Sequence, residues 1–255
     1  MNIKDKTIAI TGGSGGIGAL LSEKLLSEGA KVLVLDLIEP KNKSCGFVKA
    51  DLSNIEGIKA AGEELAGKNI DILINLAGIQ YFGEMELEAP THVQLLYNIN
   101  LLAPVVLTQS VLPSMKEKKC GKIVNIGSTF GSINFAHFVT YSSSKAGLRG
   151  FSEALRRELK DSGVSVTYVA PRAVKTPLNT DLVLKLAKQI NMNMDEPSLV
   201  ADIIVRAIIK DKKDVFIGFP EKLFVRINAI LPRVVDNALY KNDMLAKKLL
   251  QGEKK

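Results

Sequence analysis

Seven short runs of apolar, mostly β-branched residues alternate with amphipathic or polar stretches along the chain, and this alternation most constrains the fold. The runs are residues 7–11, 31–36, 46–50, 70–75, 122–127, 164–170 and 214–218. Residues 17–28, between the first two runs, carry apolar side chains at helical spacing and stop at Gly29, a typical C-terminal cap. Strands that alternate with crossover helices form a parallel sheet with helices on both faces. The sequence therefore predicts an α/β fold with a doubly wound, parallel seven-stranded sheet.

The composition is that of one globular unit. The chain has 255 residues, 46% of them hydrophobic and 24% charged, which is enough to bury one substantial core. We expect one domain over residues 1–218 and a helical extension over 219–255 that is not an independent domain. No apolar run approaches the roughly 20 residues of a membrane span. Residues 1–6 are charged and lead directly into a strand, so no signal peptide is expected.

The cysteines and histidines favour a reducing compartment and no metal site. Cys45 and Cys120 lack metal-binding or redox spacing and are expected to be free thiols. His92 and His137 are too far apart in the sequence to form a ligand motif. We therefore expect a cytoplasmic protein without a metal. The net charge of +7 suits an anionic cofactor but does not by itself indicate nucleic-acid binding, so none is expected.

The turn after the first predicted strand has the features of a dinucleotide site. It reads Thr-Gly-Gly-Ser-Gly-Gly-Ile-Gly over residues 11–18, and a helix follows at once. A tight glycine turn lets backbone N–H groups approach a pyrophosphate, and the start of the helix adds partial positive charge. This context is that of a Rossmann fold. The residues expected to hold the cofactor here are Thr11, Gly12, Ser14, Gly15, Gly16, Ile17 and Gly18.

The second predicted strand ends in Asp36, at the distance that a Rossmann fold requires for an acid on the adenosine ribose. This carboxylate would accept hydrogen bonds from both ribose hydroxyls and repel a 2′-phosphate. Neither Ser14 nor Leu37 supplies a cation for such a phosphate. NAD(H) is therefore favoured over NADP(H). The alternative is that Asp36 is only a solvated acid at a strand end.

The glycine spacing, Thr-Gly-x-x-x-Gly-x-Gly, resembles that of the short-chain dehydrogenase/reductase family in its compact branch of this length. The match runs from about residue 5 to 218. Residues 75–78 read Asn-Leu-Ala-Gly and are similar to the family's Asn-Asn-Ala-Gly strand end, with Leu76 in place of the second Asn. The resemblance implies further cofactor contacts at Asp51, Leu52, Asn75, Ala77, Gly78, Lys145, Pro171, Val174 and Thr176. It also implies a homodimer or homotetramer.

The family's catalytic tetrad falls on Asn100, Ser128, Tyr141 and Lys145, with Tyr-x-x-x-Lys intact. Four residues apart on one helix, Tyr141 and Lys145 share a face, so the ammonium would favour ionisation of a phenol whose pKa is ordinarily near 10. Ser128 closes a strand at the edge where open α/β sheets bind ligands, so its hydroxyl would hold the substrate oxygen. The resemblance implies that Lys145 also binds the nicotinamide ribose and that Asn100 anchors a water.

These residues predict an oxidoreductase that moves a hydride between the nicotinamide and a secondary alcohol or ketone, with Tyr141 as acid/base. The alternative is a non-catalytic NAD(H)-binding redox sensor, which would not need Ser, Tyr and Lys together. Residues 177–194 would form a mobile helical lid. Its apolar residues suggest a hydrophobic, lipid-like substrate, although they would equally suit the core: Leu178, Leu182, Leu184, Leu186, Ile190, Met192 and Met194.

Arg172 stands where the family usually has the glycine of Pro-Gly, before Val174 and Thr176. Either the backbone there avoids positive φ, or Arg172 points a cation towards cofactor phosphate or substrate, and we favour the first.

The last 37 residues, 219–255, depart most from the family and carry eight Lys or Arg against four Asp or Glu. Pro232 breaks this segment into two helices or starts the second one. One predicted helical face holds Leu223, Ile227, Ile230, Val234 and Ala238, with Phe224, Leu231 and Val235 beside it and Arg226 and Arg233 at its border. The first interpretation is a helix pair packed over the substrate mouth or a neighbouring subunit. The second is a peripheral anchor on anionic lipid at the inner face of a membrane.

Overall fold

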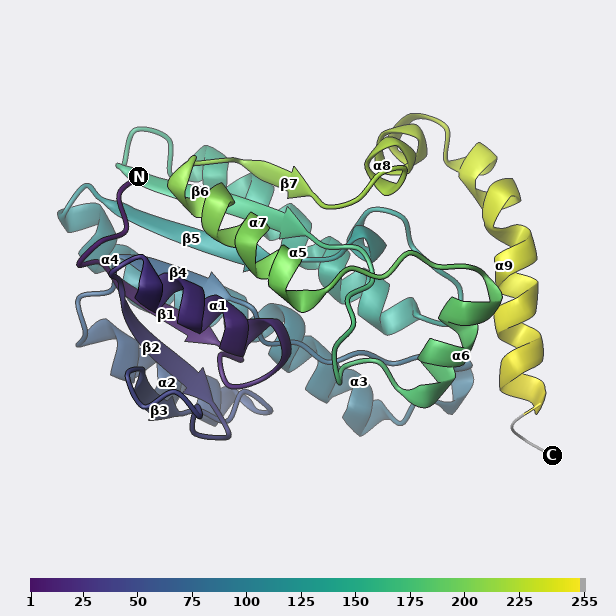
Figure 1. Ribbon diagram of the computed structural model, residues 1–255, viewed down its shortest axis with the longest axis horizontal. Helices are drawn as coiled ribbons and strands as arrows, with labels where there is room; N and C mark the ends of the chain where they lie inside the picture. The colour runs from purple at the N-terminus through teal and green to yellow at the C-terminus, as the bar shows by residue number, and fades with distance from the viewer. Residues whose placement is uncertain (253–255) are drawn as a thin grey trace.

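Seven parallel strands form one sheet in the computed structural model, which describes residues 1–252 (Figure 1). The strands are β1 (Thr7–Thr11), β2 (Lys31–Asp36), β3 (Gly46–Lys49), β4 (Ile72–Asn75), β5 (Gly121–Ile126), β6 (Val164–Ala170) and β7 (Asp214–Phe216). Their order in the sheet is β3-β2-β1-β4-β5-β6-β7. This is the predicted doubly wound arrangement, and the order reverses between β1 and β4, where such sheets bind ligands. The predicted strand ends differ from the observed ones by at most two residues.

Helices cover both faces of the sheet (Figure 1). On one face, α1 (Gly16–Ser27) packs beside α7 (Pro197–Ile209) over a core that includes Ile8, Ile10 and Val34. On the other face lie α2 (Ile55–Ala66), α4 (Ala103–Glu117) and α5 (Val139–Glu158). The central strands β4 and β5 are buried along their whole length, as expected for a parallel sheet covered on both sides.

One long helical stretch is interrupted by a π-helical turn. Helix α3 (Pro90–Tyr97) continues into α4 through a π-helical turn, Asn98–Leu102. The whole stretch, Pro90–Glu117, is long and apolar enough to cross a membrane by length and composition. The sequence did not predict this, because polar residues such as Asn98 and Asn100 interrupt its apolar runs. It packs against α2 and α5 and buries Leu107 and Val111, and 39% of its most apolar window is buried.

The carboxyl ends of the strands are covered by α6 (Asp181–Gln189), α8 (Glu221–Ile230) and α9 (Pro232–Gly252) (Figure 1). Pro232 starts the second helix of the extension, which is one of the two roles considered for it. Helix α9 packs on α6, while α8 contacts α9 and the short 3-10 turn Thr129–Gly131 after β5. Residues 253–255, the end of the predicted extension, lie outside the described part of the chain.

The apolar stripe predicted for the extension is exposed at several of its positions. Leu223, Ile230 and Val234 are 46%, 77% and 55% exposed, while the buried apolar positions include Val225 and Val235. A stripe counted through residues 223–238 assumes one continuous helix. The chain turns at the α8–α9 junction instead, so different faces of α8 and α9 are buried.

Candidate active site

The glycine loop and the start of α1 form a cradle for an anion. Gly18 must lack a side chain, because a Cβ there would lie 2.0 Å from the Gly12 carbonyl oxygen. The residue before the helix is Gly15, which has no side chain to cap it. The first N–H groups of α1, at Gly16 and Ile17, precede the first intrahelical bonds and face the groove that these residues line. A pyrophosphate fits this cradle, since it needs backbone donors and tolerates no side chains.

Asp36 is held at the rim of the same groove. Its carboxylate accepts hydrogen bonds from the backbone N–H groups of Ser14 at 3.0 Å and Ile38 at 3.3 Å. The groove encloses about 450 Å³ and is bordered on its other side by residues 76–78 and 176–178. Its lining within residues 1–252 contains no Lys or Arg. The loop and Asp36 therefore meet as predicted at one site.

Thr11 and Asn75, also predicted to hold the cofactor, do not line the groove but form hydrogen bonds next to it. The Thr11 hydroxyl accepts hydrogen bonds from the N–H groups of Leu76 and Ala77 at 3.0 and 3.1 Å, which joins the ends of β1 and β4. Asn75 points sideways within the sheet, where its Nδ2 donates to Asn125 Oδ1 at 2.8 Å.

Asp51 and Leu52, which the family resemblance implies as cofactor contacts, also lie outside the lining. Leu52 is buried in the core beneath α2. Asp51 is exposed, and its hydrogen bonds with Ser53 lower the pKa of its carboxyl group. By contrast Ala77, Gly78 and Thr176 do line the groove, as predicted.

Ser128 and Tyr141 reach one cavity from different elements. Ser128 follows β5, and its hydroxyl caps the next turn by accepting the Phe130 N–H at 3.1 Å. Tyr141 lies in the first turn of α5 and is 8% exposed. Burial raises the pKa of the Tyr141 phenol, and the hydrogen bond with Ser128 opposes this rise. The sequence predicted a lowered pKa. In the structure the desolvation of the phenol outweighs its neighbours.

Lys145 lies one turn after Tyr141 on α5 and faces the same cavity. Its Nζ donates to the Ile126 carbonyl oxygen at 3.1 Å and lies 5.9 Å from the centre of the Tyr141 ring. Burial lowers the pKa of Lys145 to about 8. The lysine thus lies close to the phenol in a desolvated environment, where its own charge titrates near neutral pH.

Asn100 completes the predicted group from the π-helical turn. The side chain is fully buried, and its Nδ2 donates to the Ile79 carbonyl at 2.9 Å and to Ser144 Oγ at 3.0 Å. Its Oδ1 accepts the Ile79 N–H at 2.9 Å. Asn100 therefore pins the chain after β4 to α5. Gly78 permits this approach, because a Cβ there would lie 3.2 Å from Asn100 Oδ1. The water contact predicted for Asn100 stays a prediction.

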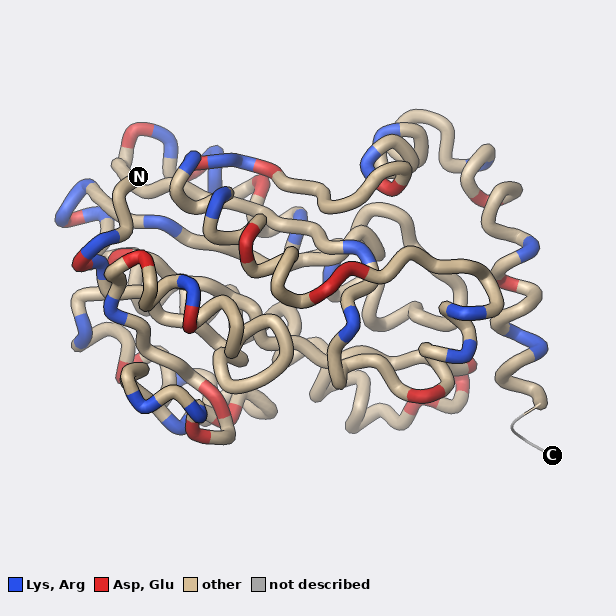
Figure 2. Tube along the Cα trace, viewed as in Figure 1, with Lys and Arg blue, Asp and Glu red and all other residues tan. Residues whose placement is uncertain are grey.

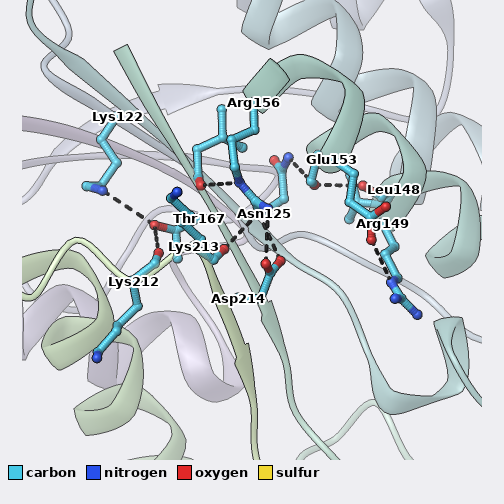
Figure 3. A network of polar contacts seen from close by, with 12 residues as sticks. Lys122, Asn125, Leu148, Arg149, Glu153, Arg156, Thr167, Lys212, Lys213 and Asp214 are labelled. Carbon is cyan, nitrogen blue, oxygen red and sulfur yellow. Dashed lines mark hydrogen bonds and ion pairs between the residues drawn. The ribbon is translucent and has the colours of Figure 1, made fainter. Parts of the chain in front are cut away.

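A polar network fixes the rest of α5 to the sheet (Figure 3). Asn125 of β5 donates to Ser152 Oγ at 2.8 Å, and Ser152 donates to the Leu148 carbonyl at 2.7 Å. Arg156 binds both carboxylate oxygens of Asp214 in β7 at 2.9 and 3.0 Å. These bonds tie the helix that carries Tyr141 and Lys145 to β5 and β7, so both side chains are positioned by rigid elements.

An apolar cavity of about 120 Å³ opens in front of Ser128, Tyr141 and Lys145. Phe130 and Phe138 form one wall, with ring centres 5.1 Å apart, and Phe130 also stacks on Phe135 at 4.2 Å. This aromatic wall was not predicted from the sequence. Three Phe between Ser128 and Tyr141, at positions 130, 135 and 138, were the signal that could have revealed it.

The lid residues reach the cavity only in part. Of the seven apolar residues named from the sequence, Leu178 and Met192 line it, together with Val183, which was not named. Leu184 points outwards and Leu186 packs behind the cavity. The reason is the start of α6, which Thr180 caps and which turns positions 183 and 186 inwards.

Arg172 clamps three segments at the mouth of the cavity. Its guanidinium binds both Asp195 carboxylate oxygens at 2.7 and 3.1 Å and lies 3.4 Å from Glu221 at the start of α8. Asp195 also forms a β-bridge with Val174, which closes the base of the lid. Arg172 is not among the residues with positive φ, as we favoured. Its cation faces two acids rather than cofactor phosphate, and neither acid was predicted from the sequence.

The site as a whole joins a dinucleotide groove to a small apolar cavity. Ile17, Leu76, Gly78, Thr176 and Leu178 line both spaces, which therefore lie next to each other. Among residues 1–252, no group of three or more His, Cys, Asp or Glu side chains is arranged to hold a metal ion.

The chain belongs to the short-chain dehydrogenase family, whose model matches residues 6–187. It is 31% identical over 252 residues to a ketoacyl reductase of Nostoc sp., covering 91% of this chain and 87% of that one. It is 32% identical over 186 residues to a D-xylose 1-dehydrogenase of Caulobacter vibrioides, covering 69% of this chain and 74% of that one.

A solved structure shares the fold. It is a short-chain dehydrogenase from Burkholderia cenocepacia in complex with NADP, with a TM-score of 0.81 at 22% identity, covering 94% of this chain and 99% of that one. The chain is thus an oxidoreductase of a family that uses nicotinamide cofactors and acts on alcohol or carbonyl groups. The two relatives act on different substrate classes by their names, so kinship alone does not name the substrate.

Proposed function

We propose that this protein interconverts an apolar ketone and its secondary alcohol with NAD(H), using Tyr141 as the acid/base. One observation carries the proposal. Ser128, Tyr141 and Lys145 line one apolar cavity, which adjoins the dinucleotide groove. A non-catalytic redox sensor, the alternative, would bind the dinucleotide without needing these three polar groups around a second cavity.

The bound nicotinamide supplies or accepts the hydride, and the residues of the chain handle the substrate oxygen. In reduction, the Ser128 hydroxyl donates a hydrogen bond to the carbonyl oxygen, and the Tyr141 phenol gives that oxygen its proton. In oxidation the same phenolic oxygen takes the proton back. Lys145 lies close enough to stabilise the phenolate that forms during the exchange, since attraction between opposite charges is strong at a buried site.

The preference for NAD(H) is supported by Asp36. Its carboxylate is held in place by two backbone N–H groups, and no Lys or Arg of the described chain lines the groove to neutralise a 2′-phosphate. The solved relative that holds NADP shares only the fold at its level of identity. The proposal of NAD(H) therefore rests on the groove of this chain.

An uncharged, apolar substrate is supported by the lining of the cavity. Phe130, Phe138, Val183 and Met192 form its walls. Lys145 and Arg172 are the only charged side chains of the described residues in that lining, and Arg172 is neutralised by Asp195 and Glu221. A substrate carboxylate or phosphate would find no free cation at the cavity mouth.

We further propose that the protein works in the cytoplasm as a homodimer or homotetramer. Both cysteines, Cys45 and Cys120, are free in the structure and fit a reducing compartment.

A spectrophotometric panel tests the proposed reaction. Apolar, polar and anionic ketones are each offered with NADH and NADPH, together with their alcohols and the oxidised cofactors, and the absorbance of reduced nicotinamide is followed. We expect the highest kcat/KM with an apolar ketone or alcohol and NAD(H). Faster turnover with NADPH, or with an anionic ketone, contradicts the corresponding assignment. Cofactor binding without turnover across the panel favours the sensor.

A further inference from the structure

Five large apolar side chains are exposed around the junction of α8 and α9. They are Phe219, Leu223, Ile230, Leu231 and Val234, each between 46% and 77% exposed. Single exposed apolar residues are ordinary on protein surfaces, but a contiguous group of them marks an interaction site. The junction projects from the body at the end of the molecule opposite the N-terminus (Figure 1). We call this region the α8–α9 corner.

Basic side chains share the outward face of α8 with the apolar ones. At 3.6 residues per turn, Lys222, Leu223, Arg226, Ala229 and Ile230 fall within an arc of about 120°, and all five are exposed. The opposite face is the one that packs. There Phe224 and Val225 join an apolar cluster with Ile133, and Asn228 Nδ2 donates to the Ser132 carbonyl at 2.8 Å. The outward face is thus amphipathic and has no partner among the described residues.

The cations of this face continue into a basic cleft. Lys222 and Arg226 line a cleft of about 460 Å³ together with Arg206, Lys210 and Lys212. The trace of α8 carries blue Lys and Arg positions in Figure 2. Within residues 1–252, none of these five cations has an ion pair. The acid in the lining, Asp214, is bound by Arg156, and the neighbouring Glu221 is bound by Arg172. The corner therefore presents uncompensated positive charge beside its apolar side chains.

We propose that the α8–α9 corner docks on the surface of an anionic lipid bilayer. Leu223 and Ile230 would enter the boundary between head groups and acyl chains, while Lys222 and Arg226 contact lipid phosphates. A second copy of the chain is the less suitable occupant. A two-fold contact through this face would bring Lys222 and Arg226 close to their own counterparts, with no free acid between them. A layer of anionic head groups offers the complementary charge.

Cosedimentation with vesicles tests the proposal on the full-length protein. Vesicles of phosphatidylcholine alone are compared with vesicles of phosphatidylcholine and phosphatidylglycerol, at low and high salt. We expect binding to the anionic vesicles only, weakened by salt. Lys222→Gln with Arg226→Gln should lower the partition coefficient about 25-fold, since each cation contributes about fivefold near an anionic surface. Leu223→Ser with Ile230→Ser should lower it about tenfold or more.

Matched variants on other surfaces are the controls. Lys59→Gln with Lys116→Gln removes two exposed cations from α2 and α4, and Leu87→Ser with Leu199→Ser removes two similarly exposed apolar side chains. Both controls should bind vesicles like the wild type, and every variant should keep its far-ultraviolet circular dichroism. No binding of the wild type to anionic vesicles, or equal losses in the controls, overturns the proposal. So does a dimer that Leu223→Ser with Ile230→Ser breaks in the absence of lipid.

Discussion

The cofactor end of this molecule is formed mainly by backbone groups, and the substrate end mainly by side chains. At the cofactor end, backbone groups of one short segment, residues 11–18, form the cradle, and Asp36 is held there by backbone N–H groups. At the substrate end, side chains from the loop after β5, from α5 and from the lid line a small cavity, and Glu221 of α8 reaches only Arg172 at its mouth. The first end is encoded locally, whereas the second depends on how distant segments pack. The two ends should therefore respond separately to mutation.

Tyr141→Phe is expected to give the largest effect and the sharpest separation of the two ends. Removing the hydroxyl removes the proposed proton donor but no group of the cofactor cradle. Turnover should fall by about a hundredfold or more, the scale of general acid catalysis. The dissociation constant for NADH, measured by isothermal titration calorimetry, should stay nearly unchanged. Tyr240→Phe is the matched control, because Tyr240 is exposed on α9. Turnover of Tyr141→Phe within a few-fold of wild type would refute the assignment.

Asp36→Ala tests the cofactor end by itself. Loss of hydrogen bonds to a charged acceptor should weaken NADH binding by about 1.5–3 kcal/mol. Binding of NADPH should improve relative to NADH, because the repulsion of a 2′-phosphate is removed, and Leu37→Arg added to this variant should improve it further. KM for the ketone should not change. Titration calorimetry with both cofactors gives the ratio. A wild-type enzyme that already binds NADPH more tightly than NADH shows that the cofactor assignment is wrong.

The same contrast explains what the sequence could predict. The strands, the glycine turn and Asp36 follow from local pattern, and Tyr141 with Lys145 follows from helical spacing within one turn. The clamp of Arg172 at the cavity mouth could not be predicted from local pattern, because Asp195 and Glu221 lie 23 and 49 residues away in the sequence. Only packing brings these charges together.

The substrate-end errors have the same origin. The inward face of α6 depends on where that helix begins, which moved the cavity contact to Val183. The predicted stripe over residues 223–238 crosses the turn before Pro232, so its positions do not share one face of a single helix. The raised pKa of Tyr141 depends on burial, which residue spacing alone does not reveal.

Lys145 lies where the two ends meet, and its titration should shape the pH profile. Burial lowers its pKa to about 8, so below that pH the ammonium is present and above it the charge is lost. Because the raised pKa of Tyr141 keeps the phenol protonated, the proton donor itself persists through this range. We therefore expect kcat/KM for ketone reduction to be level near neutral pH and to fall above about pH 8. Steady-state rates with saturating NADH from pH 6 to 10 check this.

A control variant decides whether the falling limb belongs to Lys145. Lys145→Arg keeps its charge throughout the range, so its residual activity should show no limb near pH 8. If wild type and Lys145→Arg share the same limb, another group is responsible. If the wild type has no limb below pH 10, the charge of Lys145 does not limit reduction.

The smallest expected effects are at the clamp and concern the substrate end alone. Arg172→Ala leaves Asp195, whose side chain is 5% exposed, without its bidentate partner. We expect the free energy of unfolding to fall by about 2 kcal/mol, less than for a fully buried pair because Arg172 is itself partly exposed. KM for the ketone should rise while kcat and NADH affinity change little, because the base of the lid loosens without moving Tyr141. Urea unfolding and steady-state kinetics measure both.

Glu221→Gln provides the graded comparison within the same clamp. Its ion pair with Arg172 is longer and more exposed than that of Asp195, so its loss should cost about 1 kcal/mol or less. Asp195→Asn should lie near Arg172→Ala in both stability and KM, because the two variants break the same pair. A double variant of Arg172 and Asp195 that is no worse than either single one would show that they act as one unit. If all three positions instead lowered NADH affinity as much as they raised KM, the two ends would be coupled through the residue 172–176 loop. The separation drawn between backbone-built and side-chain-built ends would then fail at that loop.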